Sequence, residues 1–480
     1  MNVKAVFNTL GKISLVESVL LLLPFAVSMI YREPSSVFAF AVTIAISAVI
    51  GGVLLLITGK HSSVIYAKEG FTIVAGVWIF ISIIGALPFT ISGEIRSYID
   101  AIFETVSGFT TTGASILIDV ERLSKGMLFW RSFTHFIGGM GFLVFVMAII
   151  PNVTDRSIHI LKAEVPGPVV GKIVPRIKDT AKILYLIYIA ITVLEIVLLI
   201  IGGMPVFDSV VHAFGTAGTG GFGIKGDSIA SYSPYCQWVI GVFMLLFGIN
   251  FNIYYLLLIK RFKDAVKSTE LWCYISIILA STAVITYNNI ELYKRLSLSL
   301  RHSFFQVSAL ITTTGYATAD FDRWSSLSKS ILFILMFIGG CAGSTGGGLK
   351  VARVMMLFKI VAREIKRLLH PRSVSSIHFE GKKVEENTIS GVSHYFIIYI
   401  ICFVAVFLLI SFEPFGFETN FSATTACFNN IGPGFGAVGP AMNYAGYTGF
   451  SKIVLSFAML LGRLEIFPLI IVLSPSAWKK

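Results

Sequence analysis

The sequence predicts an all-α polytopic membrane protein, with four tandem repeats that follow an N-terminal two-helix addition. Two observations predict this class. Of the 480 residues, 55% are hydrophobic and only 13% are charged, whereas about a quarter of the residues of a soluble protein are charged. A short segment rich in threonine and glycine also recurs four times, at the roughly hundred-residue spacing of an internal repeat.

The first and third copies of this segment are the most regular. They read Thr110-Thr111-Thr112-Gly113 and Thr312-Thr313-Thr314-Gly315. The second and fourth copies are degenerate and read Gly218-Thr219-Gly220-Gly221 and Ile431-Gly432-Pro433-Gly434. The last glycines of successive copies are 108, 94 and 119 residues apart.

The N-terminal addition, residues 1–65, contains two predicted helices at 14–30 and 36–58. Residues 36–58 carry no charge over 23 residues, which is enough to cross a hydrocarbon core of ~30 Å. No small-residue cleavage site follows the first apolar run, so we expect an uncleaved first helix rather than a signal peptide.

Each repeat then reads as a full span, a half-length apolar helix, the Thr/Gly segment and a second full span. The repeats are expected at residues 66–165, 166–268, 269–385 and 386–480. The first spans are expected at 71–92, 183–204, 271–287 and 392–412. The half-length helices, too short to cross a bilayer, are expected at 99–110, 207–218, 301–312 and 419–430. The second spans are expected at 127–150, 237–259, from 329 onward, and 450–473. This gives ten full spans and four re-entrant segments, with both termini in the cytoplasm.

The net charge of +12 follows this topology, because lysine and arginine concentrate in the loops assigned to the inner side. Nucleic-acid binding is therefore not expected. After residue 352, basic residues at Arg363, Lys366 and Arg367 fit one helix face. We expect that face to contact lipid headgroups or, alternatively, a regulatory subunit.

The Thr/Gly segments predict a cation filter. Non-helical backbone at membrane depth occurs only where it is buried in protein or lines water, so four such segments predict one shared pore with pseudo-fourfold symmetry. Backbone carbonyls can replace the water of a cation, and glycine reaches backbone angles closed to other residues. The absence of acidic residues from the segments favours a monovalent cation. For a single copy, close helix packing would be the alternative.

Glycine-rich residues Gly339–Lys350 interrupt the second span of repeat three. Six of these twelve residues are glycine, and each glycine costs a helix roughly 1 kcal/mol relative to alanine. We expect an intramembrane gating loop, with a packing contact between helices as the alternative. The residues assigned to the gate are Gly339, Gly340, Gly343, Gly346, Gly347, Gly348, Lys350 and Arg463.

Arg463 is a basic residue expected at the middle of the last span, where it costs about 2.5–3.5 kcal/mol. We expect it to face the pore beneath the filter. The alternative is a buried ion pair with Glu17 or Glu195.

Other chemistry lacks support in the sequence. Two glycine-rich stretches imitate nucleotide-binding loops without the required βαβ unit or Gly-Lys-Ser/Thr. No hydrolase motif is present, and His135, His212 and His302 lack metal-ligand spacing. The five cysteines are scattered singly and are expected to be buried apolar residues.

The chain resembles the Trk/Ktr/HKT superfamily of potassium transporters, and within it the bacterial TrkH-type membrane subunits. The matching stretches are SGFTTTGAS, HFIGGMGF, TGGFG, ITTTGYAT, GGCAGSTGGGLK, NNIGPGFGAVGP and GRLEIFPL. The resemblance implies four pore units around one potassium pathway, a homodimer in the bacterial inner membrane, and control by a cytosolic nucleotide-binding ring of the TrkA type. It also implies filter glycines at Gly113, Gly221, Gly315 and Gly434. An ion-coupled secondary transporter, moving potassium with H⁺ or Na⁺, is the alternative function.

Overall fold

The computed structural model describes residues 1–59, 67–141, 177–372 and 375–475, and its regular structure is almost entirely helical. In these residues, six helical segments are long and apolar enough to cross a membrane. Many of their exposed side chains are apolar, as Leu56 shows with 84% of its surface exposed. The segments are α1–α2 (Val3–Leu20, Leu22–Ile30), α3 (Pro34–Thr58), α4–α5 (Ala67–Gly85, Leu87–Ile91), α10 (Ile177–Ile201), α15 (Thr269–Asn288) and α20 (Glu386–Ile410).

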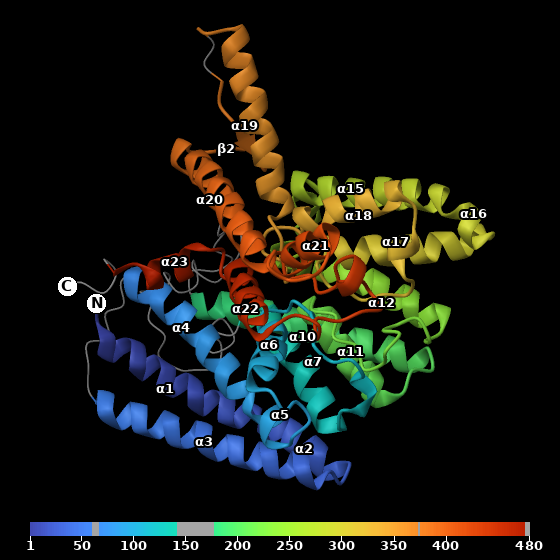
Figure 1. Ribbon diagram of the computed structural model, residues 1–480. Coiled ribbons are helices and arrows are strands. Elements are labelled where there is room, and N and C mark those ends of the chain that lie inside the picture. Colours follow the sequence, from blue (N-terminus) through green and yellow to red (C-terminus); the bar gives the residue numbers. More distant parts are fainter. Residues whose placement is uncertain (60–66, 142–176, 373–374, 476–480) are drawn as a thin grey trace.

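The N-terminal pair of helices precedes the first predicted repeat. Helices α1 and α3 run side by side (Figure 1) and approach closely where Gly11 meets Gly51. The hydroxyl of Ser14 donates to the carbonyl of Ser47 at 2.7 Å in this contact. The pair packs on α4, the first helix of repeat one.

Four short helices precede the Thr/Gly segments, within a few residues of the predicted positions. They contain 12, 13, 16 and 12 residues, so none qualifies as a span. These pore helices are α6 (Tyr98–Phe109), α11 (Val206–Gly218), α17 (Leu296–Ile311) and α21 (Phe417–Phe428).

The second helix of each repeat begins with the same cap. A serine or threonine side chain accepts a hydrogen bond from the backbone N–H three residues later, which satisfies a free donor of the first turn. The caps are Ser124 on α7 (Lys125–Gly139), Ser233 on α12 (Pro234–Phe247), Ser325 on α18 (Ser326–Ile338) and Thr448 on α22 (Gly449–Arg463). A short 3₁₀ turn precedes three of these helices. The turns are η1 (Val120–Arg122) before α7, η3 (Phe321–Arg323) before α18 and η4 (Gly436–Val438) before α22.

The second helices are not the continuous spans that the sequence predicts. Helix α12 is bent by 90° relative to α13 (Phe251–Leu258). Helix α22 breaks before α23 (Phe467–Leu473), where Glu465 and Ile466 have positive φ. Helix α7 ends at Gly139, and Gly141 has a φ of 81°. The predicted segments 237–259 and 450–473 are therefore broken rather than continuous helices, and 127–150 is interrupted. Residues 142–150 lie outside the described part of the chain.

Repeat three breaks as predicted, between α18 and α19 (Val351–Leu369). Helix α19 projects away from the body of the molecule, beside the hairpin of β1 (His378–Phe379) and β2 (Lys382–Lys383) (Figure 1). Short helices α14 (Phe262–Val266) and α16 (Ile290–Tyr293) flank α15 at its two ends.

The four repeats close into a ring. The second helix of each repeat packs on the pore helix of the next: α7 on α11, α12 on α17, α18 on α21, and α22 back on α6. This cyclic order brings the ends of the four pore helices together. The N-terminus and α23 lie on the same side of the molecule (Figure 1).

Candidate functional site

The four pore helices end in the same turn. Just after each helix, a single residue adopts the left-handed conformation. The N–H of the next residue donates to the carbonyl five residues before it, at 2.8–2.9 Å. This is the Schellman ending of a helix. The left-handed residues are Thr111, Thr219, Thr313 and Asn430, with φ values of 56°, 54°, 61° and 57°.

This turn fixes the register of the fourth segment, which differs from the prediction. Two residues after each left-handed residue stands a glycine with positive φ: Gly113, Gly221, Gly315 and Gly432. The fourth segment is therefore Asn429–Gly432, two residues earlier than expected. Gly434 is not in this position, because its α-carbon faces Ser422 and Val438. Pro433 remains at the edge of the ring, beside Gly315.

The glycines close the segments into a ring. A methyl group added to any of them would lie closer than 3.0 Å to a backbone oxygen of the next segment. The oxygens are those of Gly220 for Gly113, Thr314 for Gly221, Ile431 for Gly315 and Thr112 for Gly432. Space and φ together thus require glycine at these positions.

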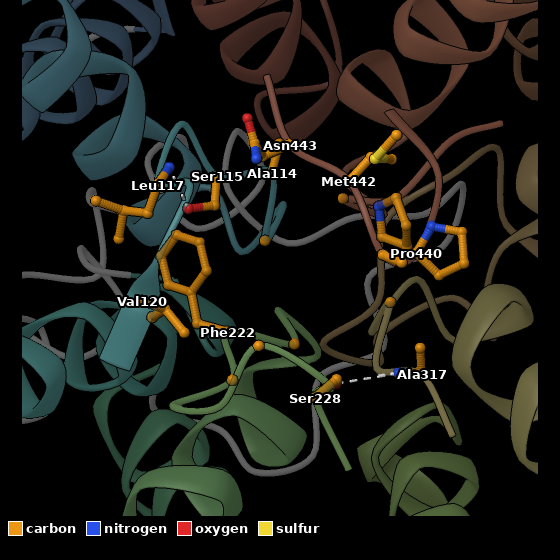
Figure 2. A pocket seen from close by; sticks show the side chains of 18 of the residues that line it. Ala114, Ser115, Leu117, Val120, Phe222, Ser228, Ala317, Pro440, Met442 and Asn443 are labelled. Carbon is orange, nitrogen blue, oxygen red and sulfur yellow. Dashed lines mark hydrogen bonds between the residues drawn. The ribbon is translucent and has the colours of Figure 1, made fainter. Parts of the chain in front are cut away.

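A cavity of about 150 Å³ lies against the four glycines. Figure 2 shows loops of all four repeats around it, marked by Ser115, Phe222, Ala317 and Met442. The residues that line it follow the glycines in sequence. The cavity therefore lies at the end of the segments that is farther from the pore helices.

Side chains behind the segments hold them in place. In the first and third copies, the two outer threonine hydroxyls of the TTT run are hydrogen-bonded to each other at 2.8 Å. Asn430 connects copies four and one, because its Nδ2 donates to Thr112 Oγ1 at 2.9 Å. The hydroxyl of Tyr444 donates to the carbonyl of Gly432 at 2.8 Å.

The glycine-rich loop Gly339–Lys350 lies at the other end of the segments. The N–H of Gly347 donates to Thr313 Oγ1 at 2.6 Å, and the N–H of Gly348 donates to the carbonyl of Asn429 at 3.1 Å. Both acceptors precede the ring glycines in sequence, so the loop and the cavity lie at opposite ends of the four segments.

The glycines of the loop are required by geometry. Gly339, Gly343 and Gly348 have φ values of 77°, 72° and 71°. Side chains on the remaining three would crowd backbone oxygens or the Ser344 hydroxyl: Gly340 faces Ser344 and Gly248, Gly346 faces Thr312, and Gly347 faces Asn429. Lys350 donates to the carbonyl of Gly346 within the loop.

Glu270 at the start of α15 joins the two ends of this loop. Its Oε1 accepts hydrogen bonds from the N–H of Ala342 at 2.6 Å and of Ala352 at 3.2 Å. The first lies inside the loop and the second in the first turn of α19. Movement of α19 therefore involves the loop directly.

Comparison with known proteins agrees with this geometry. Residues 36–480 match the TrkH family model, which is described as a cation transport protein. The chain belongs to the TrkH family. It is 35% identical to the Trk system potassium uptake protein TrkH of Salmonella typhimurium, over 100% of both chains. It is also 35% identical to TrkG of Escherichia coli, over 100% of this chain and 99% of the relative.

The fold agrees as well. The crystal structure of the potassium transporter TrkH from Vibrio parahaemolyticus matches with a TM-score of 0.90 and 32% sequence identity, over 100% of both chains. This TrkH-family chain is therefore an integral membrane transport protein and not an enzyme.

In this member of the TrkH family, Arg463 of repeat four bonds to repeats three and one. Its guanidinium donates to the carbonyl of Thr345 in the loop at 3.0 Å and to that of Gly139 at the end of α7 at 2.7 Å. Among the described residues, the carboxylates of Glu17 and Glu195 have no hydrogen-bond partner, so neither forms the alternative ion pair there. Glu465 instead pairs with Arg353, with N–O distances of 2.5 and 3.0 Å.

A buried ion pair that the sequence did not reveal fixes the loops around the cavity. Arg131 on α7 and Glu104 on α6 approach to 2.7 Å, with 3% and 0% of their side chains exposed. Glu104 also accepts from the N–H of Ile116 at 3.0 Å, and Arg131 donates to the carbonyl of Gly223 at 3.1 Å. The loops that follow copies one and two are thereby joined.

Proposed function

We propose that the protein takes up potassium across the bacterial inner membrane through a ring of backbone oxygens. The observation that carries this proposal is the closed ring of four segments, in which each glycine faces a carbonyl of its neighbour. The relatives named above are described as potassium uptake proteins. The segments Thr110–Gly113, Gly218–Gly221, Thr312–Gly315 and Asn429–Gly432 would replace the water around the ion.

The pore helices favour a cation in this ring. Each helix ends at its segment, so the negative end of its dipole points toward the ring. No carboxylate occurs within the segments. The ring would thus stabilise a dehydrated monovalent cation with peptide dipoles alone, as potassium filters do.

We propose further that Gly339–Lys350 and Arg463 form the gate. The loop is bonded to the segments through Thr313 and Asn429, and Arg463 attaches it to α7. Opening would require the loop to leave these partners. The bonds to Glu270 provide a mechanical connection from α19 to the loop.

Regulation and assembly are proposed to act through α19. An apolar stripe, spaced as one helix face, is exposed on this projecting helix, where no element of the described residues covers it: Phe358, Val361, Ile365 and Leu368. We assign the stripe to a second copy of the chain in a homodimer. The basic residues of α19 would contact lipid headgroups or a cytosolic nucleotide-binding ring of the TrkA type, with both termini in the cytoplasm.

The test is potassium and sodium flux into proteoliposomes that contain the full-length protein. Gly113→Ser and Gly315→Ser are each expected to lower the K⁺/Na⁺ flux ratio, because the added side chain collides with the ring. Unchanged ratios in both variants would falsify the filter.

A second candidate function is ion-coupled potassium transport. It is favoured by the buried carboxyl groups of Glu17 and Glu195. Within the part of the chain that the structure describes, they have no hydrogen-bond partner, and both lie within spans, where ionisable residues mark functional sites. Single-channel recording separates the two functions. Discrete unitary currents exclude a strict transport cycle, whereas potassium accumulation driven by a proton or sodium gradient supports it.

A further inference from the structure

His135 on α7 lies between the first and second copies of the Thr/Gly segment. The side chain is completely buried. Its Nδ1 lies 2.8 Å from the carbonyl oxygen of Gly108, in the last turn of the first pore helix. A carbonyl can only accept, so Nδ1 carries the hydrogen. On its other side, the imidazole packs against the ring of Phe222, with centroids 4.2 Å apart.

The imidazole occupies the space that side chains of the second copy would need. A methyl group on Gly220 would collide with Nδ1, Cγ and Cε1 of His135. A methyl group on Gly218 would collide with the carbonyl of His135 and meet its Cβ at 3.0 Å. The second copy is therefore glycine-rich because α7 fills the positions behind it.

The same two positions carry threonine in the regular copies. They are Thr110 and Thr112 in the first copy and Thr312 and Thr314 in the third, and in each copy the two hydroxyls are hydrogen-bonded at 2.8 Å. The second copy has no side chains to form this pair. It has instead a ring from another helix, which is bonded to the neighbouring pore helix.

We propose that His135 is a positioning residue for ion selectivity. It replaces the absent threonine pair of the second copy and connects that copy to the first pore helix, and it thereby sets the width of one side of the ring. Asn430 performs the corresponding task between copies four and one, through its bond to Thr112. This inference rests on the proposed potassium filter, because it assigns a role in that filter.

The first test compares two substitutions of His135 in the full-length protein, by K⁺ and Na⁺ flux into proteoliposomes. His135→Asn keeps an N–H close to the place of Nδ1, whereas His135→Leu fills the space without a donor. We expect the Leu variant to lose about tenfold or more in the K⁺/Na⁺ flux ratio. The bond from α7 to the carbonyl of Gly108 is then absent, and that carbonyl keeps local donors such as the N–H of Thr111. The Asn variant is expected to retain most of the ratio.

The second test adds a methyl group at Gly220 and removes the imidazole of His135 that occupies the same space. Gly220→Ala alone is expected to lower the flux ratio, because its methyl group collides with the imidazole. In Gly220→Ala/His135→Ala the methyl group enters the vacated space, so we expect a higher ratio than in Gly220→Ala. Gly113→Ala/His135→Ala is the matched control and is expected to show no recovery, because Gly113 faces the backbone of Gly220 rather than a side chain.

Two results would overturn this role: equal ratios in His135→Leu and the parent protein, or no recovery in the Gly220→Ala/His135→Ala pair. His212→Leu is the control for loss of a buried histidine, because its Nδ1 bonds within its own pore helix, to the carbonyl of Asp208 at 2.7 Å. If Gly113→Ser loses discrimination while His135→Leu keeps it, only the role of His135 fails. If Gly113→Ser also keeps it, the filter itself fails.

Discussion

Gly432→Ala tests the register of the fourth segment. The structure places Gly432 in the ring, whereas the sequence alone assigned Gly434. Gly432 has a φ of 97°, and an added Cβ would lie 2.8 Å from the carbonyl oxygen of Thr112 and 2.9 Å from the carbonyl carbon of Gly113. A non-glycine residue in such a conformation is strained by about 1–3 kcal/mol, before the collision is added.

This strain is large on the scale of ion selectivity, because about 1.4 kcal/mol corresponds to a tenfold change in a population. The variant can relieve it by turning a peptide of the ring away from its position, which removes one oxygen from the ion. We therefore expect Gly432→Ala to lower the K⁺/Na⁺ flux ratio in proteoliposomes at least about tenfold.

Gly434→Ala is the matched control in the same proline-glycine turn. The added methyl group would lie 2.9 Å from Ser422 Oγ and from Val438 Cγ2, away from the ring. We expect a lower melting temperature in detergent with an unchanged flux ratio. The reasoning is refuted if Gly434→Ala abolishes discrimination while Gly432→Ala preserves it.

Three further predictions concern the gate and the loops. Arg463→Gln is expected to raise K⁺ flux in the absence of any regulatory subunit by about tenfold, because hydrogen bonds from a charged donor are worth about 1.5–3 kcal/mol; unchanged flux would argue against a gate at this position. Thr313→Val removes the acceptor for the N–H of Gly347 and the donor to the carbonyl of Thr312, so we expect higher K⁺ flux together with a lower K⁺/Na⁺ ratio; unchanged K⁺ flux would argue against the bond between the loop and the third segment as part of the gate. Arg131→Met leaves Glu104 buried and unpaired, which costs about 3–5 kcal/mol. Its melting temperature should fall well below that of Glu104→Gln/Arg131→Met, and equal values would contradict this pairing.

The sequence predicted the repeat, the pore helices and three of the four segments, because these depend on local patterns. Half-length apolar runs that end in Thr and Gly recur visibly along the chain. The fourth segment was predicted two residues too late, because the sequence there contains two glycines, Gly432 and Gly434. The residue that decides between them is Asn430, which adopts the left-handed conformation. Asparagine tolerates this conformation well, so the NNIG sequence did contain the information.

The breaks in the second helices were recognised only in repeat three. Six glycines mark that break, whereas Gly248 marks the break in repeat two and the pair Glu465 and Ile466 marks that in repeat four. One glycine, or none, does not distinguish a broken helix from a continuous one. The breaks depend instead on contacts between repeats, such as the bond of Arg463 to the carbonyl of Gly139. Such contacts join residues more than three hundred positions apart and cannot be recognised from local sequence.

The ring of four unequal segments has a consequence for how this protein can change. In a channel assembled from four identical subunits, every substitution in the pore appears four times, so even a small defect is multiplied. In this protein, a substitution at one position of the chain changes one quarter of the ring. Each quadrant already has its own support: a threonine pair, an imidazole, or an asparagine. Selectivity in such a protein can therefore be adjusted in single steps, one quarter of the ring at a time.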